Sequence, residues 1–220
     1  MTRETIWQIA MTSADDAGVP LGTIFIGYPT TKKDYIPTQT LIDLYNEKDI
    51  RLKTYFGKYH LTVSSGNAAD IYFFNKYPGN EYYNALGSET RYLNQPKPFR
   101  IAEMYLIATE ANAKIGTAAA VKKGNDALNA LKKARIKGWT DATYDQEALL
   151  NEIMNERERE LVGEGYRLMD LKRWGKGVKR GKPQSKGLVL FPGQASTDGL
   201  DKPMDDQRML WPIPKTEMDA

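Results

Sequence analysis

The chain lacks cysteine altogether and has one histidine, His60, among its 220 residues. Without cysteine, thiol catalysis, disulfide scaffolds, cysteine-ligated zinc and iron–sulfur clusters are excluded. A single histidine also excludes zinc sites built on several histidines, and any Ser-His-Asp triad that does not use His60. Because His60 lies between Tyr59 and Leu61 with no recognisable partner, we interpret it as a surface or hydrogen-bonded side chain rather than a functional one.

Long apolar runs and a strong excess of one charge are missing as well. No segment approaches the roughly 20 apolar residues that cross a bilayer, and the first residues lack the apolar region of a signal peptide. The 31 basic and 28 acidic side chains give a net charge of +3, which is too small an excess to indicate nucleic acid as the partner. With 41% hydrophobic residues, the composition is typical of one globular domain.

One local run is basic, with seven Lys or Arg side chains within residues 172–186. No nucleic-acid motif accompanies this run, so we interpret it as part of a solvated loop. Gly181-Lys182-Pro183 lacks the first glycine and the final Ser or Thr of a phosphate-binding loop. No residue pattern predicts a metal site or a cofactor.

The sequence changes character near Pro96 and Pro98. Residues 1–97 are irregular and aromatic-rich, whereas residues 98–220 are dominated by Ala, Leu, Lys and Glu. We therefore divide the chain into these two parts. In the first part, residue patterns predict a helix at 40–47 and short strands at 5–9, 22–26, 52–56 and 71–74.

Two helices are predicted at the start of the second part. The first spans 99–115 and ends at Gly116, with a buried stripe formed by Ile101, Met104, Tyr105, Ala108, Ala111 and Ile115. The second lies within 117–137 and stops before Gly138, with a stripe formed by Ala127, Leu128, Leu131 and Ala134. Alanines on both helices permit the close approach of a tetratricopeptide-like hairpin.

Two further helices should form a second hairpin. Thr143 stands three residues before Gln146, which is capping-box spacing, and predicts a helix ending near Gly163 or Gly165. A shorter helix is expected over 166–174, closed by Gly175, and residues 175–209 should form a long surface loop. The predicted fold is mainly α, with tetratricopeptide-like helical hairpins, irregular loops and a few short strands.

Aromatic side chains concentrate in the first part, which holds ten of the thirteen tyrosines. A tyrosine offers a flat apolar face and a hydrogen-bonding edge, the combination that a sugar ring needs. On this chemistry alone, the candidate ligand-binding residues are Tyr55, Tyr59, Tyr72, Tyr82 and Tyr83. Each is individually more typical of a core or strand position.

Carboxylates gather at Glu156, Glu158, Glu160 and Asp170. A glycosidase needs two carboxylates flanking a sugar, one of them with a raised pKa. Helical pitch places Glu156 and Glu160 on one face, but the interleaved arginines lower carboxylate pKa values. We therefore interpret this cluster as structural ion pairs and expect no catalytic residue.

Several segments resemble, in order, the C-terminal region of the SusD/RagB family: 98–111 (PFRIAEMYLIATEA), 127–131 (ALNAL), 156–161 (EREREL), 164–167 (EGYR), 170–175 (DLKRWG) and 210–214 (LWPIP). Looser matches occur in the first part: 4–7 (ETIW), 37–39 (PTQ) and 49–51 (DIR). The matched motifs are of scaffold type, with the Glu/Arg-rich helix and the LWPIP segment expected to lock the hairpins together.

The resemblance implies a function. Such proteins are surface-exposed outer-membrane lipoproteins of Bacteroidetes that bind oligosaccharides without chemistry and deliver them to a SusC-like TonB-dependent transporter. Family members are longer and begin with a signal and a lipid-bearing cysteine, so we expect this chain to be a C-terminal fragment whose ligand site is shared with the rest. Two alternatives remain open: a helical-repeat protein–protein interaction module without a glycan ligand, and a glycosidase that uses the carboxylates named above.

Overall fold

The computed structural model describes residues 4–10, 22, 25, 35–62, 68–87, 92–184, 201–210 and 215–218. Its elements in chain order are β1 (Thr5–Trp7), α2 (Gln39–Ile42), α3 (Ile50–Tyr55), β2 (Phe56–Thr62), β3 (Ala68–Phe74), α4 (Glu81–Leu86), β4 (Phe99–Arg100), α5 (Ile101–Ile115), α6 (Ala118–Arg135), α7 (Gln146–Glu160), α8 (Arg167–Arg173), the 3-10 helix η2 (Gln207–Met209) and α9 (Lys215–Met218). The predicted mainly α fold is confirmed. None of the helices in these described ranges combines the length and apolar character of a membrane span.

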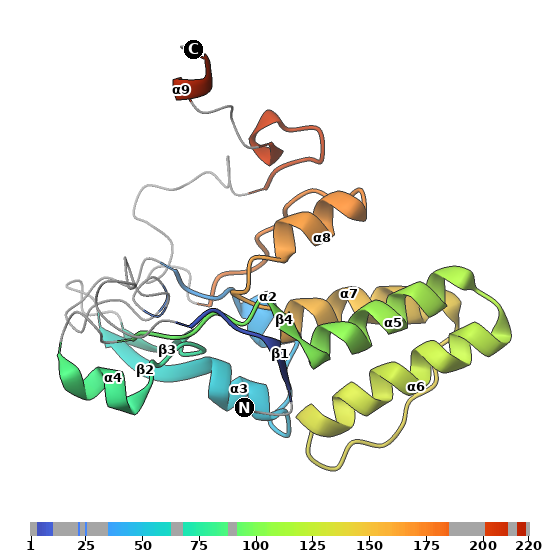
Figure 1. The fold of residues 1–220 in the computed structure, drawn as a ribbon, viewed down its shortest axis with the longest axis horizontal. Coiled ribbons are helices and arrows are strands. Elements are labelled where there is room, and N and C mark those ends of the chain that lie inside the picture. Colours follow the sequence, from blue (N-terminus) through green and yellow to red (C-terminus); the bar gives the residue numbers. More distant parts are fainter. Residues whose placement is uncertain are drawn as a thin grey trace.

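The long helices α5, α6 and α7 pack together (Figure 1), with α5 against both α6 and α7. The predicted hairpin of α5 and α6 is confirmed, and Gly116 adopts the left-handed conformation of a C-terminal cap, with φ 75°. Gly124 of α6 lies at the crossing, where an added Cβ would approach Leu149 Cδ2 to 2.9 Å and the Thr109 carbonyl oxygen to 3.1 Å. A glycine there allows the three helices to pack closely.

The second predicted hairpin is modified. The N-cap of α7 is Asp145 rather than Thr143, because the Asp145 side chain accepts a hydrogen bond from the Ala148 backbone N–H. Helix α7 packs mainly along α5, and α8 meets it through the buried ion pair of Arg157 with Asp170. A turn containing Gly163 and Gly165, both at positive φ, redirects the chain between the two helices.

The buried face of α5 differs from the prediction. The expected stripe is largely exposed, since Met104 is 39% exposed, whereas Leu106 on the opposite face is 0% exposed. The helix is apolar on two opposite faces, so periodicity alone does not choose between them. The buried face includes Glu103 and Glu110, whose carboxylates accept hydrogen bonds from α8 and its flanks, from Tyr166 and Arg173 respectively. These partners make burial of an apparently polar face favourable.

The first part contains two antiparallel pairs, β1 with β4 and β2 with β3. Strand β3 covers the predicted 71–74, and β1 covers part of 5–9. The strand predicted at 52–56 is wrong for most of its length, because α3 runs to Tyr55 and begins at the N-cap Asp49. At 22–26 the two described residues, Gly22 and Phe25, are helical. Helix α2 is shorter than the helix predicted at 40–47.

Within 175–184 and 201–210, the described segments of the predicted loop, the regular elements are η2 and an isolated bridge between Val178 and Lys202. Residues 211–214 of the LWPIP segment lie outside the described residues. The division of the chain near Pro96 and Pro98 stays a prediction. Contacts join the two parts, since β1 pairs with β4 across that point.

The burial of α5 is tested by a matched pair of substitutions. Leu106→Ala should lower the free energy of unfolding by about 2–5 kcal/mol, because it leaves a cavity between α5, α6 and α7. Met104→Ala should change it by less than about 1 kcal/mol. Urea unfolding followed by circular dichroism measures both. Equal losses in the two variants would contradict the buried face described above.

Candidate ligand-binding cleft and its ion-pair floor

A buried ion-pair network joins α3, β4, α6 and α7. Glu160, fully buried at the end of α7, accepts hydrogen bonds from three arginines: Arg51 on α3 (2.9 Å), Arg100 on β4 (2.9 Å) and Arg135 on α6 (3.0 Å). One carboxylate therefore connects four elements that are distant in sequence. These are charge-assisted hydrogen bonds, which are stronger than those between neutral groups.

The network continues along α7. Arg51 Nη1 also donates to Glu156 Oε1 at 2.7 Å, and its Nη2 donates to Asp49 Oδ2 at 2.8 Å. Arg159 donates to the other Glu156 oxygen at 2.8 Å. Within the described residues, no buried side-chain nitrogen or oxygen lacks a hydrogen-bond partner. The predicted ion pairing of Glu156 and Glu160 is confirmed.

Both central carboxylates are ionised. Burial by itself opposes ionisation of Glu160, but the hydrogen bond and charge of Arg135, together with Arg100 and Arg51, lower its pKa to about 2. Burial likewise opposes ionisation of Glu156, where the Arg51 and Arg159 charges outweigh it and lower the pKa. Neither group is set up as a general acid, which requires a raised pKa.

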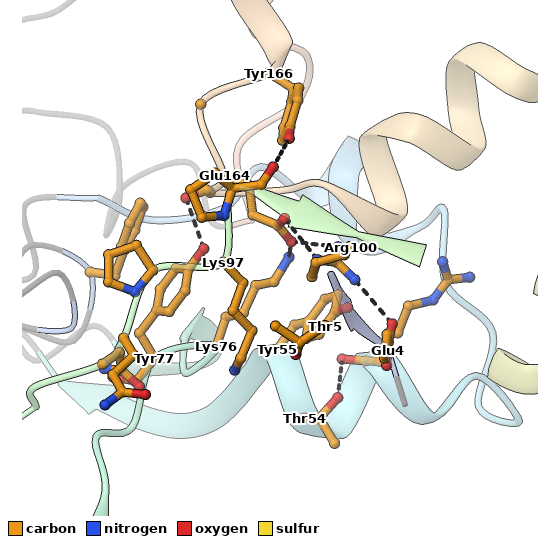
Figure 2. A pocket seen from close by; sticks show the side chains of 18 of the residues that line it. Glu4, Thr5, Thr54, Tyr55, Lys76, Tyr77, Lys97, Arg100, Glu164 and Tyr166 are labelled. Atoms are coloured by element: carbon orange, nitrogen blue, oxygen red, sulfur yellow. Dashed lines mark hydrogen bonds and ion pairs between the residues drawn. The ribbon is translucent and has the colours of Figure 1, made fainter. Parts of the chain in front are cut away.

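A cleft of about 940 Å³ lies over this network. Its wall includes Arg100 and Glu164, which are joined by hydrogen bonds of 3.0 and 2.7 Å. Figure 2 shows Glu164 between Lys76 and Arg100, with Tyr77 to one side and Tyr166 to the other. The charged groups of this wall are thus largely occupied with one another.

Lys76 is held inside the wall of the cleft. Its ammonium donates to Glu164 and to the carbonyl oxygens of Glu160 and Val162, and it lies 4.1 Å from the ring centroid of Tyr55. Burial lowers the pKa of Lys76 to about 8, although Glu164 opposes the shift. Every donor of this ammonium is used structurally, so we assign it no direct ligand contact.

Aromatic and neutral polar groups make up much of the remaining lining. Tyr77 donates its hydroxyl to the Gly163 carbonyl (3.1 Å). The single O–H of Tyr166 is shared between the Pro98 carbonyl (2.6 Å) and the Glu103 carboxylate (2.8 Å). The Tyr55 hydroxyl has no hydrogen-bond partner among the described residues, and burial raises its pKa above the ordinary range. It therefore remains a protonated donor available to a ligand.

The structure does not gather the five predicted tyrosines. Tyr55 lines the cleft, whereas Tyr82 lies on α4 and is 66% exposed. Tyr59 and Tyr72 project from opposite faces of the β2–β3 pair, because Tyr59 is paired with Ile71 and directly opposed residues share a face. The Tyr83 side chain lies outside the described residues. The role of these five in ligand binding stays a prediction.

Several lining residues were not found from the sequence: Tyr77, Asn94, Gln95, Lys97 and Tyr166. They come from segments far apart in the chain, and no local motif links them. In the described ranges, no group of three or more His, Asp or Glu side chains is arranged to hold a metal ion.

Comparison with known proteins decides the family. A model of the SusD family matches residues 3–220. The chain belongs to the SusD family. Among curated proteins, no match was found.

Solved structures agree with this SusD fold. A SusD superfamily protein from Bacteroides thetaiotaomicron is similar at 21% identity and a TM-score of 0.76, covering 100% of this chain and 47% of that one. One from Bacteroides vulgatus has 24% identity and a TM-score of 0.68, covering 98% and 44%. A SusD-like carbohydrate-binding protein from Bacteroides vulgatus has 24% identity and a TM-score of 0.62, covering 98% and 47%. The chain spans less than half the length of each.

Replacing Glu160 by Gln should lower the free energy of unfolding by about 3–5 kcal/mol, because three buried guanidinium groups lose their shared counter-charge. Asp126→Asn is the matched control. It breaks the exposed pair with Lys122 and should cost less than about 1 kcal/mol. Chemical unfolding at neutral pH measures both, and a small loss in Glu160→Gln would contradict the central role of the network.

The network should also set the acid stability. The pKa of Glu160 is lowered from 4.5 to about 2 on folding, so its stabilising contribution is complete above the unfolded pKa and is lost as the pH falls towards 2. Unfolding midpoints of the wild type should therefore decrease from about pH 5 downwards. Glu160→Gln should show a shallower decrease in the same titration. Parallel curves would show that other carboxylates carry the acid sensitivity.

Proposed function

We propose that this chain is part of a non-catalytic, surface-exposed SusD-family lipoprotein of the bacterial outer membrane. The whole protein would bind oligosaccharide nutrients and deliver them to a SusC-like TonB-dependent transporter. The observation that carries the proposal is the family match over residues 3–220. It is supported by the similarity to a solved SusD-like protein described as carbohydrate-binding.

The cleft is the proposed place of glycan contact on this chain. Its volume of about 940 Å³ lies at the upper end of the range of small-molecule sites, roughly 300–1,000 Å³. Tyr55, Tyr77 and Tyr166 supply aromatic surface, and Gln95 supplies a neutral amide. The Asn94 amide is already bonded to the backbone of Gly79, Tyr77 and Tyr92. This mixture suits sugar rings, which present apolar C–H faces and a rim of hydroxyl groups.

The ion pairing of the four carboxylates supports ligand binding without catalysis. Glu156 and Glu160 are buried and held ionised by arginines. Asp170 is bound by Arg157 at 2.7 Å and by Arg173 at 2.9 Å. Burial raises the pKa of Glu158, but its carboxylate is bound by Arg167 at 2.7 Å. A glycosidase needs an acid and a second carboxylate facing one substrate, and these four groups face guanidinium groups instead.

Protein–protein interaction is a second candidate function, favoured by one observation. The exposed face of α5 carries Ile101, Met104, Tyr105 and Ile115, which are each between 38% and 65% exposed. An apolar stripe of this kind is typical of a contact surface. This contact surface is compatible with glycan binding elsewhere on the chain. Met104→Lys should reduce association of the protein with a polypeptide partner without changing its affinity for glycans.

The glycan proposal is tested at the Tyr55 hydroxyl. Tyr55→Phe removes the donor while keeping the ring, so it should weaken oligosaccharide binding by about 3- to 30-fold with little change in stability. Isothermal titration against neutral gluco-, xylo-, manno- and galacto-oligosaccharides measures the affinity. Tyr105→Phe, on the exposed face of α5, is the matched control and should bind like the wild type.

Two other results bear on the wider proposal. Absence of binding to every oligosaccharide by the whole protein would count against a glycan ligand. Purification of the whole protein from native outer membranes should recover a TonB-dependent barrel. An adjacent gene for such a barrel would support the same pairing.

A further inference from the structure

A second groove, of about 280 Å³, lies between α7 and α8 and shares no lining residue with the cleft. Asn151, Asn155 and Glu158 line it from α7, at the four- and three-residue steps that keep side chains on one helix face. Arg167 lines it from α8, and Trp174 from the C-cap of that helix. The volume is just below the roughly 300–1,000 Å³ of small-molecule sites, which suits one sugar unit better than an extended oligosaccharide.

The indole of Trp174 is held in a fixed orientation. Its N–H donates to Glu110 Oε1 on α5 at 3.1 Å, and the guanidinium of Arg173 lies 4.6 Å from its ring centroid. Arg173 is itself fixed, because it donates to Glu110 at 2.6 Å and to Asp170 at 2.9 Å. A ring already ordered in the unbound protein loses little conformational entropy when a ligand stacks on it.

Three charged side chains line the groove: Glu158 and Arg167, which pair with each other, and Lys176; its amides are available. Arg167 binds Glu158 at 2.7 Å. Asn151 and Asn155 are exposed, and their side chains have no hydrogen-bond partner in the part of the chain that the structure describes. Met154 and Leu171 add apolar surface. An aromatic platform with hydrogen-bond donors and acceptors around it favours a polyhydroxylated ring over an apolar ligand.

We propose that this groove is a second glycan contact, in which one pyranose ring stacks on Trp174 while its hydroxyls bond to the amides of Asn151 and Asn155. The proposal rests on the proposed function, because it assigns a further contact to the same class of ligand. Two separated contacts on one chain raise the apparent affinity for long glycans over short ones, since the second contact forms at high effective concentration.

The test removes the aromatic side chain of Trp174 and leaves helix α8 in place. Trp174→Ala should weaken binding of long neutral oligosaccharides by about tenfold or more, as expected for loss of an aromatic anchor. Asn155→Ala should weaken it by a smaller factor, and Trp174→Phe should restore part of the loss. Met169→Ala, an exposed change on the opposite side of α8, should bind like the wild type. Isothermal titration gives the affinities, and saturation-transfer NMR on a monosaccharide reports contact with the groove.

The outcomes separate this inference from the proposed function. If Tyr55→Phe weakens oligosaccharide binding and Trp174→Ala leaves it unchanged, the second contact is overturned and the proposed glycan binding is retained. Failure of the wild type to bind any of the oligosaccharides overturns both. Melting curves show whether Trp174→Ala has loosened α8. If it has, partial recovery of binding in Trp174→Phe together with weaker binding in Asn155→Ala still supports the groove.

Discussion

The shared burial of the Glu160 carboxylate by three arginines is the interaction on which this structure depends. A buried carboxylate is costly unless it is paired and hydrogen-bonded. Arg51, Arg100 and Arg135 reach it from α3, β4 and α6. Separating the four elements would leave at least one of these charges buried without a partner. The free-energy cost of that state keeps the elements in one arrangement. The short strands and the long helices therefore form one connected body around this carboxylate.

The same network accounts for the family motifs. The loosely matched segments 4–7 and 49–51 supply Glu4, Asp49 and Arg51, and the helical motifs supply Arg100, Glu156 and Glu160. Segments that resemble the SusD family in separate parts of the chain therefore meet at one place. They describe a scaffold, and the neutral and aromatic groups of the cleft and the groove lie beside it.

Much of the secondary structure of the second part was predictable, because its signals are local. Helix periodicity and the left-handed Gly116 depend only on neighbouring residues. The errors arose where a helix cap or a distant contact outweighs the preference of a short segment. The segment 52–56 has strand-like residues, but Asp49 caps a helix there. Helical spacing places Arg51 and Tyr55 on one face, with Arg51 directed to Glu160 and Tyr55 to the cleft. Tertiary contacts override such weak strand preferences.

The sequence by itself determined the family, the order of the long helices and the ion-pairing character of the Glu/Arg-rich helix, since each depends on residues close together in the chain. The tertiary structure alone decided which face of α5 is buried, because the carboxylates of Glu103 and Glu110 need partners from α8 and its flanks. It also decided which tyrosine reaches the cleft. Ligand surfaces are assembled from distant segments, so no local pattern records them.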